Sequence, residues 1–80
     1  MAGTALTTSG QDITGDFDLQ SRITGTAQHA TVMKSMGSST TDWVTLAAIQ
    51  PGEVLFVKNT GTNSYKLASA ASGCVIEWDQ

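Results

Sequence analysis

Apolar and polar residues alternate with a period of two in several short runs of this chain, and turn-forming residues separate the runs. In residues 16–24 (DFDLQSRIT), the odd-numbered positions from Phe17 to Ile23 fall on one face of an extended segment. The charged and polar positions between them fall on the other face. Such alternation is typical of a half-buried β-strand, because successive side chains of a strand point to opposite faces.

Further runs with strand character follow at short intervals, and they cover residues 26–36, 42–49, 53–58, 64–68 and 74–78. A helix is the alternative for the first of these, which contains Ala, Gln, Met and Lys, but its Thr and Val residues favour a strand. Several short strands separated by turn signals are typical of an all-β domain. We expect a small antiparallel β-sandwich or barrel of about 6–7 short strands.

The densest pattern lies in residues 51–68 (PGEVLFVKNTGTNSYKLA). Residues 53–58 are apolar on both faces, so we expect them to form the most buried strand, in the middle of a sheet. Residues 59–63 are turn formers, and Tyr65 and Leu67 then share one face of a returning strand. The stretch therefore predicts a central β-hairpin.

Residues 1–11 (MAGTALTTSGQ) are small and polar apart from Leu6. We expect them to form a flexible or extended arm that precedes a single β domain over residues 12–80. A chain of 80 residues with one cysteine has no intrachain disulfide. Domains of this size often gain stability from oligomerisation or docking, which is a first indication of function.

Charge is sparse in this chain. Charged residues make up 14% of the sequence, and the formal net charge is −3. A soluble domain typically carries about 25% charged residues. The sequence shows no cationic footprint for nucleic acid, no secretory signal and no apolar run long enough to cross a membrane. We expect a soluble protein, made in the cytosol, that contacts neither nucleic acid nor membrane.

Residues suited to catalysis are few. His29 is the only histidine and Cys74 the only cysteine, and we expect both to be ordinary surface or packing residues. Asp12, Asp16 and Asp18 do not match the spacing of a calcium loop, so a solvated acidic face is expected. The sequence predicts no enzyme, no cofactor and no metal site.

Aromatic residues offer a different kind of function. A tryptophan beside Asn or Asp side chains can stack on a sugar ring. A carbohydrate-binding face that uses Trp43 with Tyr65, or Trp78, is therefore an alternative, although core packing explains each aromatic residue as well.

The run TDWVTLAAIQPGEVLFVKNTGTNSYKLA (41–68) resembles a pattern in small all-β structural proteins of tailed bacteriophages. In these proteins a Trp-containing strand leads to a Pro-Gly turn, an apolar strand that ends in Lys-Asn or Arg-Asn, a Gly-Thr-Asn or similar turn, and a Tyr-containing return strand. The resemblance covers roughly a third of the chain and contains no catalytic signature. The residues that carry it are Trp43, Pro51, Gly52, Val54, Phe56, Lys58, Asn59, Thr60, Gly61, Asn63 and Tyr65.

The resemblance implies a virion protein. The leading expectation is a capsid decoration or cement protein that binds the outer capsid surface and the major capsid protein, as a small homo-oligomer such as a trimer. The alternative is a small tail or fibre-associated subunit. Apolar anchors and an extended arm would make the contacts, and the residues predicted to bind the partner are Thr4, Leu6, Thr8 and Trp78.

Overall fold

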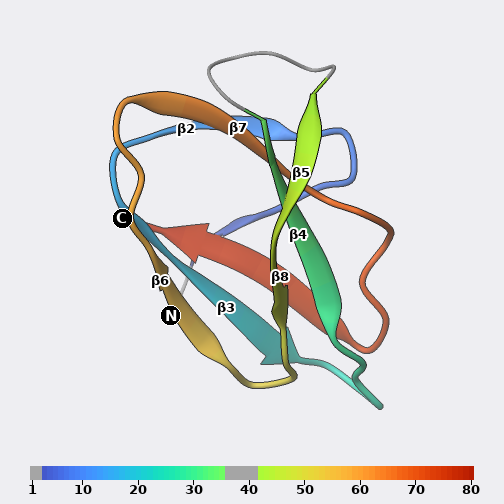
Figure 1. Ribbon diagram of the computed structural model, residues 1–80. Helices are drawn as coiled ribbons and strands as arrows, with labels where there is room; N and C mark the ends of the chain where they lie inside the picture. The colour runs from blue at the N-terminus through green and yellow to red at the C-terminus, as the bar shows by residue number, and fades with distance from the viewer. Residues whose placement is uncertain (1–2, 36–41) are drawn as a thin grey trace.

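A computed structural model describes residues 3–35 and 42–80 of the chain (Figure 1). These residues contain eight strands and no helix: β1 (Thr4–Ala5), β2 (Gln11–Thr14), β3 (Phe17–Ile23), β4 (Ala30–Ser35), β5 (Trp43–Ile49), β6 (Val54–Val57), β7 (Thr62–Leu67) and β8 (Cys74–Asp79). The all-β prediction is confirmed. The strand count is eight instead of six or seven, because β1 and β2 begin within the segment expected to be an arm.

The strands form two four-stranded antiparallel sheets. The first sheet has the order β1-β8-β3-β6, and the second has the order β2-β7-β4-β5. One apolar core lies between them. It contains Phe17, Leu19 and Ile76 from the first sheet and Ile13, Val32 and Tyr65 from the second, each at most 2% exposed. Burial of these side chains is the main favourable contribution to folding.

Nearly every connection crosses from one sheet to the other. Among the described strands, β4 and β5 are the only neighbours in sequence that share a sheet. The predicted hairpin of residues 51–68 is therefore wrong: β6 pairs with β3, whereas β7 pairs with β2 and β4. The turn predicted for residues 59–63 is only partly correct, because β6 ends at Val57 and Thr62 and Asn63 already belong to β7. Turn residues show where the chain reverses, but they do not show whether the two flanking strands pair.

The prediction that β6 is the most buried strand is also wrong. β6 lies at the edge of the first sheet and pairs with β3 alone. Leu55 and Val57 point toward the core, whereas Val54 and Phe56 are 55% and 62% exposed. A strand that is apolar on both faces suits a central position, but the same pattern arises when the outer face of an edge strand is apolar.

The N-terminal segment is an integral part of both sheets. Thr4 and Ala5 pair with Trp78 and Glu77 of β8, and Leu6 is only 4% exposed in the core. The Thr7 carbonyl then accepts a hydrogen bond of 2.9 Å from the Leu67 amide of the second sheet. The expected flexible arm is thus not observed. Small polar residues pair as readily as others here because strand pairing uses backbone groups.

The remaining strands agree with the sequence pattern. β3 buries Phe17, Leu19 and Ser21 on its inner face, although Ile23 at its end is 55% exposed. Residues 30–35 form a strand and not a helix, with an irregularity in pairing between Val32 and Met33. Met36 and the loop predicted for residues 37–41 lie outside the described residues.

A buried asparagine joins two corners of the fold. The Asn59 side-chain amide donates hydrogen bonds to the carbonyls of Ile13 (3.0 Å) and Gly15 (2.9 Å). Its oxygen accepts from the Asn63 amide (2.6 Å) and the Tyr65 hydroxyl (2.7 Å). The corner between β6 and β7 is therefore fixed to the corner between β2 and β3.

Candidate docking site

Two exposed apolar side chains lie side by side on the outer face of the first sheet. Val54 and Phe56 are two residues apart on β6, opposite Gln20 and Asp18 of β3. Since alternate residues of a strand share a face, the two side chains form one surface, which we call the β6 patch. Ile23, also 55% exposed, lies next to the Gly52 turn that leads into β6. Apolar area is thus concentrated at this edge.

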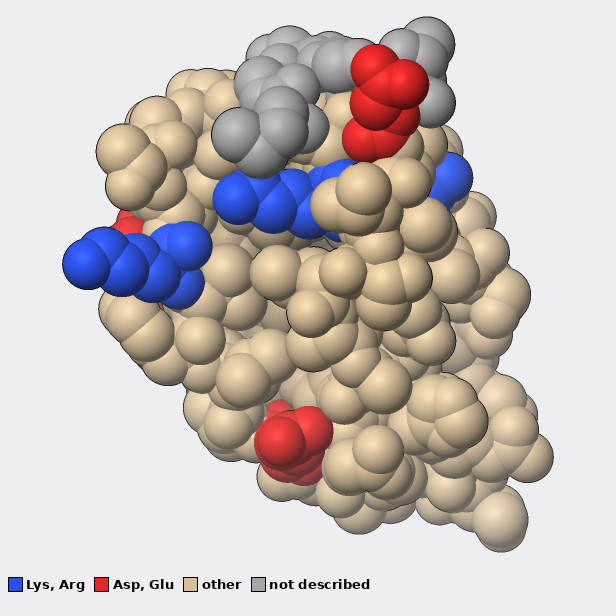
Figure 2. All heavy atoms as spheres, in the orientation of Figure 1, with Lys and Arg blue, Asp and Glu red and all other residues tan. Residues whose placement is uncertain are grey.

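The neighbouring edge of the second sheet is uncharged. β5 contains no Asp, Glu, Lys or Arg between Trp43 and Ile49, and Val44 is 60% exposed. Figure 2 shows a broad area without charged side chains in the middle of this view, below the blue lysine side chains, where the lower parts of β4 and β5 lie. Natural edge strands usually carry charges or proline that prevent pairing with other chains. β5 and β6 have little of this protection.

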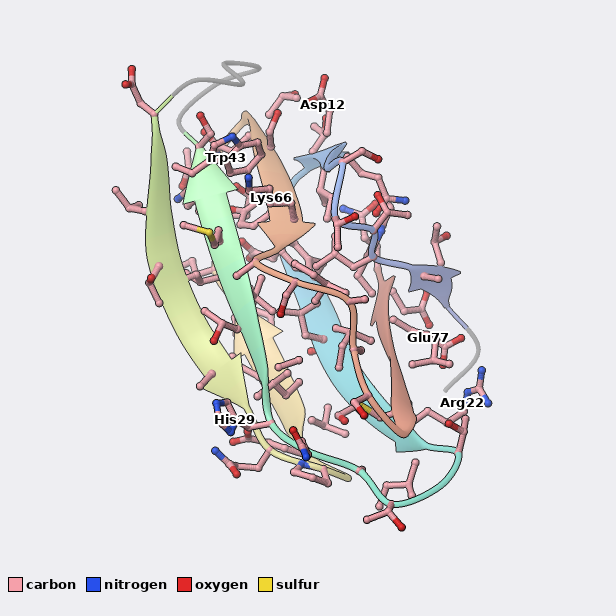
Figure 3. The ribbon with its side chains drawn as sticks, turned by 90° about the vertical axis from the view of Figure 1, so that its right-hand side faces the viewer. Asp12, Arg22, His29, Trp43, Lys66 and Glu77 are labelled. Carbon is pink, nitrogen blue, oxygen red and sulfur yellow. The ribbon has the colours of Figure 1, made fainter. Side chains whose placement is uncertain are left out.

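An apolar hollow lies near the opposite edge of the first sheet. It has a volume of about 250 Å³ and is lined by Leu6, Leu67, Ala71, Cys74, Val75 and Ile76, among other uncharged residues. We call it the Leu6 hollow. Its walls are the segment after β1, the loop before β8, and the first half of β8. In the view of Figure 3, β5 lies at the left of the molecule and β1 at the right.

The residues predicted to bind a partner come together on the β1 side. Thr4 is the register partner of Trp78, and Leu6 and Thr8 both line the Leu6 hollow. Thr4 and Thr8 are exposed, whereas Leu6 is buried and Trp78 packs against the core, its ring centroid 6.2 Å from that of Phe17. Most of the apolar surface of Leu6 and Trp78 is therefore used inside the fold.

The sequence prediction did not include Val54 and Phe56 among the contact residues. A signal for them was present, because a short strand with two apolar faces needs a covering layer on each side. That reasoning led to a central position in the sheet. An edge strand whose outer face is covered by another molecule meets the same requirement.

The Trp43 side chain covers part of the outer face of the second sheet. It begins a row of register partners that continues with Ser35, Ser64 and Asp12, one from each strand. The indole reaches across the small serines as far as Gly10, where a side chain would lie 3.2 Å from its ring. Ser35 and Ser64 are at most 3% exposed. The small serines leave room for the ring.

Polar groups surround the far end of this indole (Figure 3). The Lys66 ammonium lies 4.6 Å from the centre of the Trp43 ring, a cation–π geometry. The Ser64 hydroxyl donates a 2.5 Å hydrogen bond to Asp12. A polar pocket of about 240 Å³ adjoins Trp43, Asp12 and Gly10. These contacts connect the edge strand β5 to the chain that leads into β2.

Tyr65 and Trp43 do not share an exposed surface on which a sugar ring could stack. Tyr65 is fully buried, and its ring centroid lies 4.8 Å from that of Phe17 in the core. Trp43 lies over the serines and carries Lys66 against its ring. We interpret Trp43 as a structural residue whose side chain packs across the outer face of the second sheet.

The other polar residues with possible chemistry lie apart. His29 is exposed, Cys74 is buried, and Arg22 forms a 2.8 Å ion pair with Glu77 across the first sheet (Figure 3). Asp16 accepts a hydrogen bond from the Asn59 backbone amide. Within residues 3–35 and 42–80, no three His, Cys, Asp or Glu side chains are grouped as metal ligands, and no helix is long and apolar enough to span a membrane.

Comparisons of this chain with protein-family models, with curated proteins and with solved structures find no match.

Proposed function

We propose that this chain is a non-enzymatic structural subunit that acts by docking onto other protein surfaces. The observation that carries the proposal is the β6 patch, in which Phe56 is 62% exposed and Val54 is 55% exposed. Burying the exposed part of one such side chain against a partner gains roughly 1–2 kcal/mol. Contiguous exposed apolar surface is typical of a site that contacts another protein.

The scaffold for this function is a small β-sandwich built from the two sheets. Eighty residues bury a smaller share of their surface than a larger domain does. Docking onto an assembly of other subunits buries additional surface. The contact that positions this chain therefore also stabilises its folded state.

The assembly that we propose is a bacteriophage capsid, on which this chain acts as a decoration or cement protein bound to the major capsid protein. The support for this part is the resemblance of residues 41–68 to small phage structural proteins. The low content of charged residues, 14%, suits docking through apolar and backbone contacts. Many copies on one shell would add their weak contacts through multivalency.

Binding to isolated shells tests the proposal. Purified protein is mixed with expanded capsid shells that lack it, and the shells are sedimented. We expect co-sedimentation of the wild-type chain and its loss for Phe56→Asp. Thr60→Asp is the matched control, since it places the same charge at an exposed position in the turn outside both edge strands and should leave binding intact.

Two results would contradict the proposal. One is a wild-type chain that never sediments with shells, and the other is a Phe56→Asp chain that binds as well as the wild type. Electron microscopy of particles with a labelled chain separates the shell from the tail, and label on the tail would replace the capsid role with the tail-associated alternative.

A further inference from the structure

The β6 patch and the Leu6 hollow lie at opposite edges of the same sheet. β6 is the last strand in the order β1-β8-β3-β6, and the hollow adjoins β8 and the segment after β1, at the other end. One molecule therefore presents an exposed apolar side chain on one side and an apolar recess on the other. The two features are too far around the fold to meet within one chain.

The hollow suits a phenyl ring in size and chemistry. Its volume is about 250 Å³, and no charged residue lines it. Apolar cavities of about 150 Å³ in proteins accept a benzene molecule, so the side chain of Phe56 fits with room to spare. Leu6, Cys74 and Ile76 are at most 7% exposed, so the ring would mainly contact the partly exposed Ala71 and Val75.

Both features are already held in place by backbone hydrogen bonds. The Leu6 amide donates to the Ile76 carbonyl at 2.7 Å, which fixes one wall of the hollow. The opposite wall is anchored where the Ala68 amide donates to Thr31 at 2.9 Å. Phe56 is opposite Asp18 in the paired strands β6 and β3. Little ordering is needed on contact, which favours association.

We propose that Phe56 of one copy inserts into the Leu6 hollow of a second copy, so that this chain assembles head to tail. The inference rests on the proposed docking function and names a second copy of the chain as the first partner. A second copy is favoured over a foreign protein because every copy presents both the exposed Phe56 ring and the Leu6 hollow.

The proposed contact joins two different surfaces of the chain, the exposed Phe56 on β6 and the hollow beside β8 at the other end of the sheet. Such a contact is heterologous. A head-to-tail contact gives a closed ring when its rotation closes, and an open chain otherwise.

Mixing two complementary variants tests the inference. Phe56→Asp removes the inserted ring and leaves the hollow intact, whereas Ala71→Phe fills the hollow and leaves Phe56 intact. Light scattering against concentration should show self-association of the wild type and monomers for each variant alone. The equimolar mixture should form dimers and nothing larger, because one working contact remains.

Other results of the mixing experiment are decisive as well. If the β6 patch bound the same patch on another copy, Ala71→Phe would still dimerise alone and the mixture would gain nothing. A wild-type chain that stays monomeric up to millimolar concentration also overturns the inference. It would leave the proposed function intact, since docking of monomers onto capsid shells is measured separately. Circular dichroism confirms that each variant is folded.

Cysteine cross-linking gives a second readout at the contact itself. Cys74 is the only cysteine in the chain and is buried, so it is first replaced by serine. When Phe56→Cys and Ala71→Cys are combined on that background, dissolved oxygen should oxidise the new thiols of neighbouring chains to disulfides, which gives a ladder of linked chains on a non-reducing gel. Phe56→Cys alone on the same background should give no more than dimers. A combined variant that never extends beyond dimers would contradict the proposal.

Discussion

The N-terminal segment and β6 show opposite relations between sequence and burial. The N-terminal segment has a small, polar sequence, yet it supplies β1, β2 and the buried residues Leu6 and Ile13. β6 is entirely apolar, yet half of its side chains face outward. The difference shows that the place of a strand in its sheet decides burial, and that the apolar residues left outside are available for contact with other molecules.

Asn59 joins these two regions, and its removal should have the largest effect on folding. Asn59→Ala removes the donor to the carbonyls of Ile13 and Gly15 and the acceptor of the Tyr65 hydroxyl, whereas the Asn63 amide keeps its hydrogen bond to the Thr60 carbonyl. Each buried polar group without a hydrogen bond costs about 1–3 kcal/mol. We expect a loss of about 4–5 kcal/mol in the free energy of unfolding, measured by denaturant titration.

The neighbouring Thr60 is the control for Asn59. It lies in the same turn and its side chain is exposed, so Thr60→Ala should change stability by less than about 0.5 kcal/mol. An Asn59→Ala protein as stable as Thr60→Ala would show that the link between the two corners contributes little.

Leu6 tests whether the N-terminal segment belongs to the core. Leu6→Ala removes a side chain that is 4% exposed, and we expect it to lower the free energy of unfolding by about 2–4 kcal/mol. Thr8→Ala, at an exposed position two residues away, should have little effect. A flexible arm would instead predict that both variants match the wild type, and denaturant titration distinguishes the two outcomes.

The sequence predicted the fold class and most strand positions because period-two alternation survives wherever one face of a strand meets the core, as in β3. It did not predict β1 and β2, whose pairing depends on backbone groups that every residue carries. It also did not predict which strands pair, since the turn at residues 59–61 looks the same in a hairpin and in a crossing between sheets. The β6 patch was missed for that reason.

The residues of the candidate docking site were predicted only in part. Leu6 and Thr8 were predicted contact residues and do line the Leu6 hollow, but Phe56 was assigned to the core. Lys66, which packs against Trp43, was not predicted, because the sequence gives no register between β5 and β7. The sequence does not show which residues of strands far apart in the chain lie side by side, and only the folded sheet reveals this.

Trp43 should contribute less to stability than Leu6, because it covers the outer face of a sheet and not the core. We expect Trp43→Ala to cost about 1–3 kcal/mol, through lost contact with the serine row and with Lys66. Lys66→Met keeps the length of the side chain and removes its charge, so it should cost about 1 kcal/mol or less. Equal losses for the two variants would assign the whole effect to the cation–π contact.

Tyr65 should make stability fall at high pH. Burial raises the pKa of its phenol above the ordinary value of 10.0. Above that pH the unfolded chain releases the phenol proton while the folded chain keeps it, so stability is full below pH 10 and declines as the pH rises through the folded pKa.

Tyr65 is the only tyrosine, so its ionisation is followed directly by tyrosinate absorbance in the near ultraviolet. Tyr65→Phe should lose about 1 kcal/mol at neutral pH, from the hydrogen bond to Asn59, and should flatten the decline above pH 10. A variant with the same alkaline decline as the wild type would assign that decline to other groups.

Substitution of Phe56 should have the smallest effect on monomer stability, in contrast to substitution of the buried Phe17. The chain has two phenylalanines: Phe17 is 2% exposed between the sheets, and Phe56 is 62% exposed at the edge. Phe17→Ala should cost about 3–5 kcal/mol of folding free energy, because it opens a cavity in the core. Phe56→Ala should change the stability of the monomer by less than about 0.5 kcal/mol, because water already reaches its ring. Denaturant titration at low protein concentration separates monomer stability from association. A large loss for Phe56→Ala under those conditions would mean that the β6 patch supports the fold itself, which would remove the main reason for assigning it to docking.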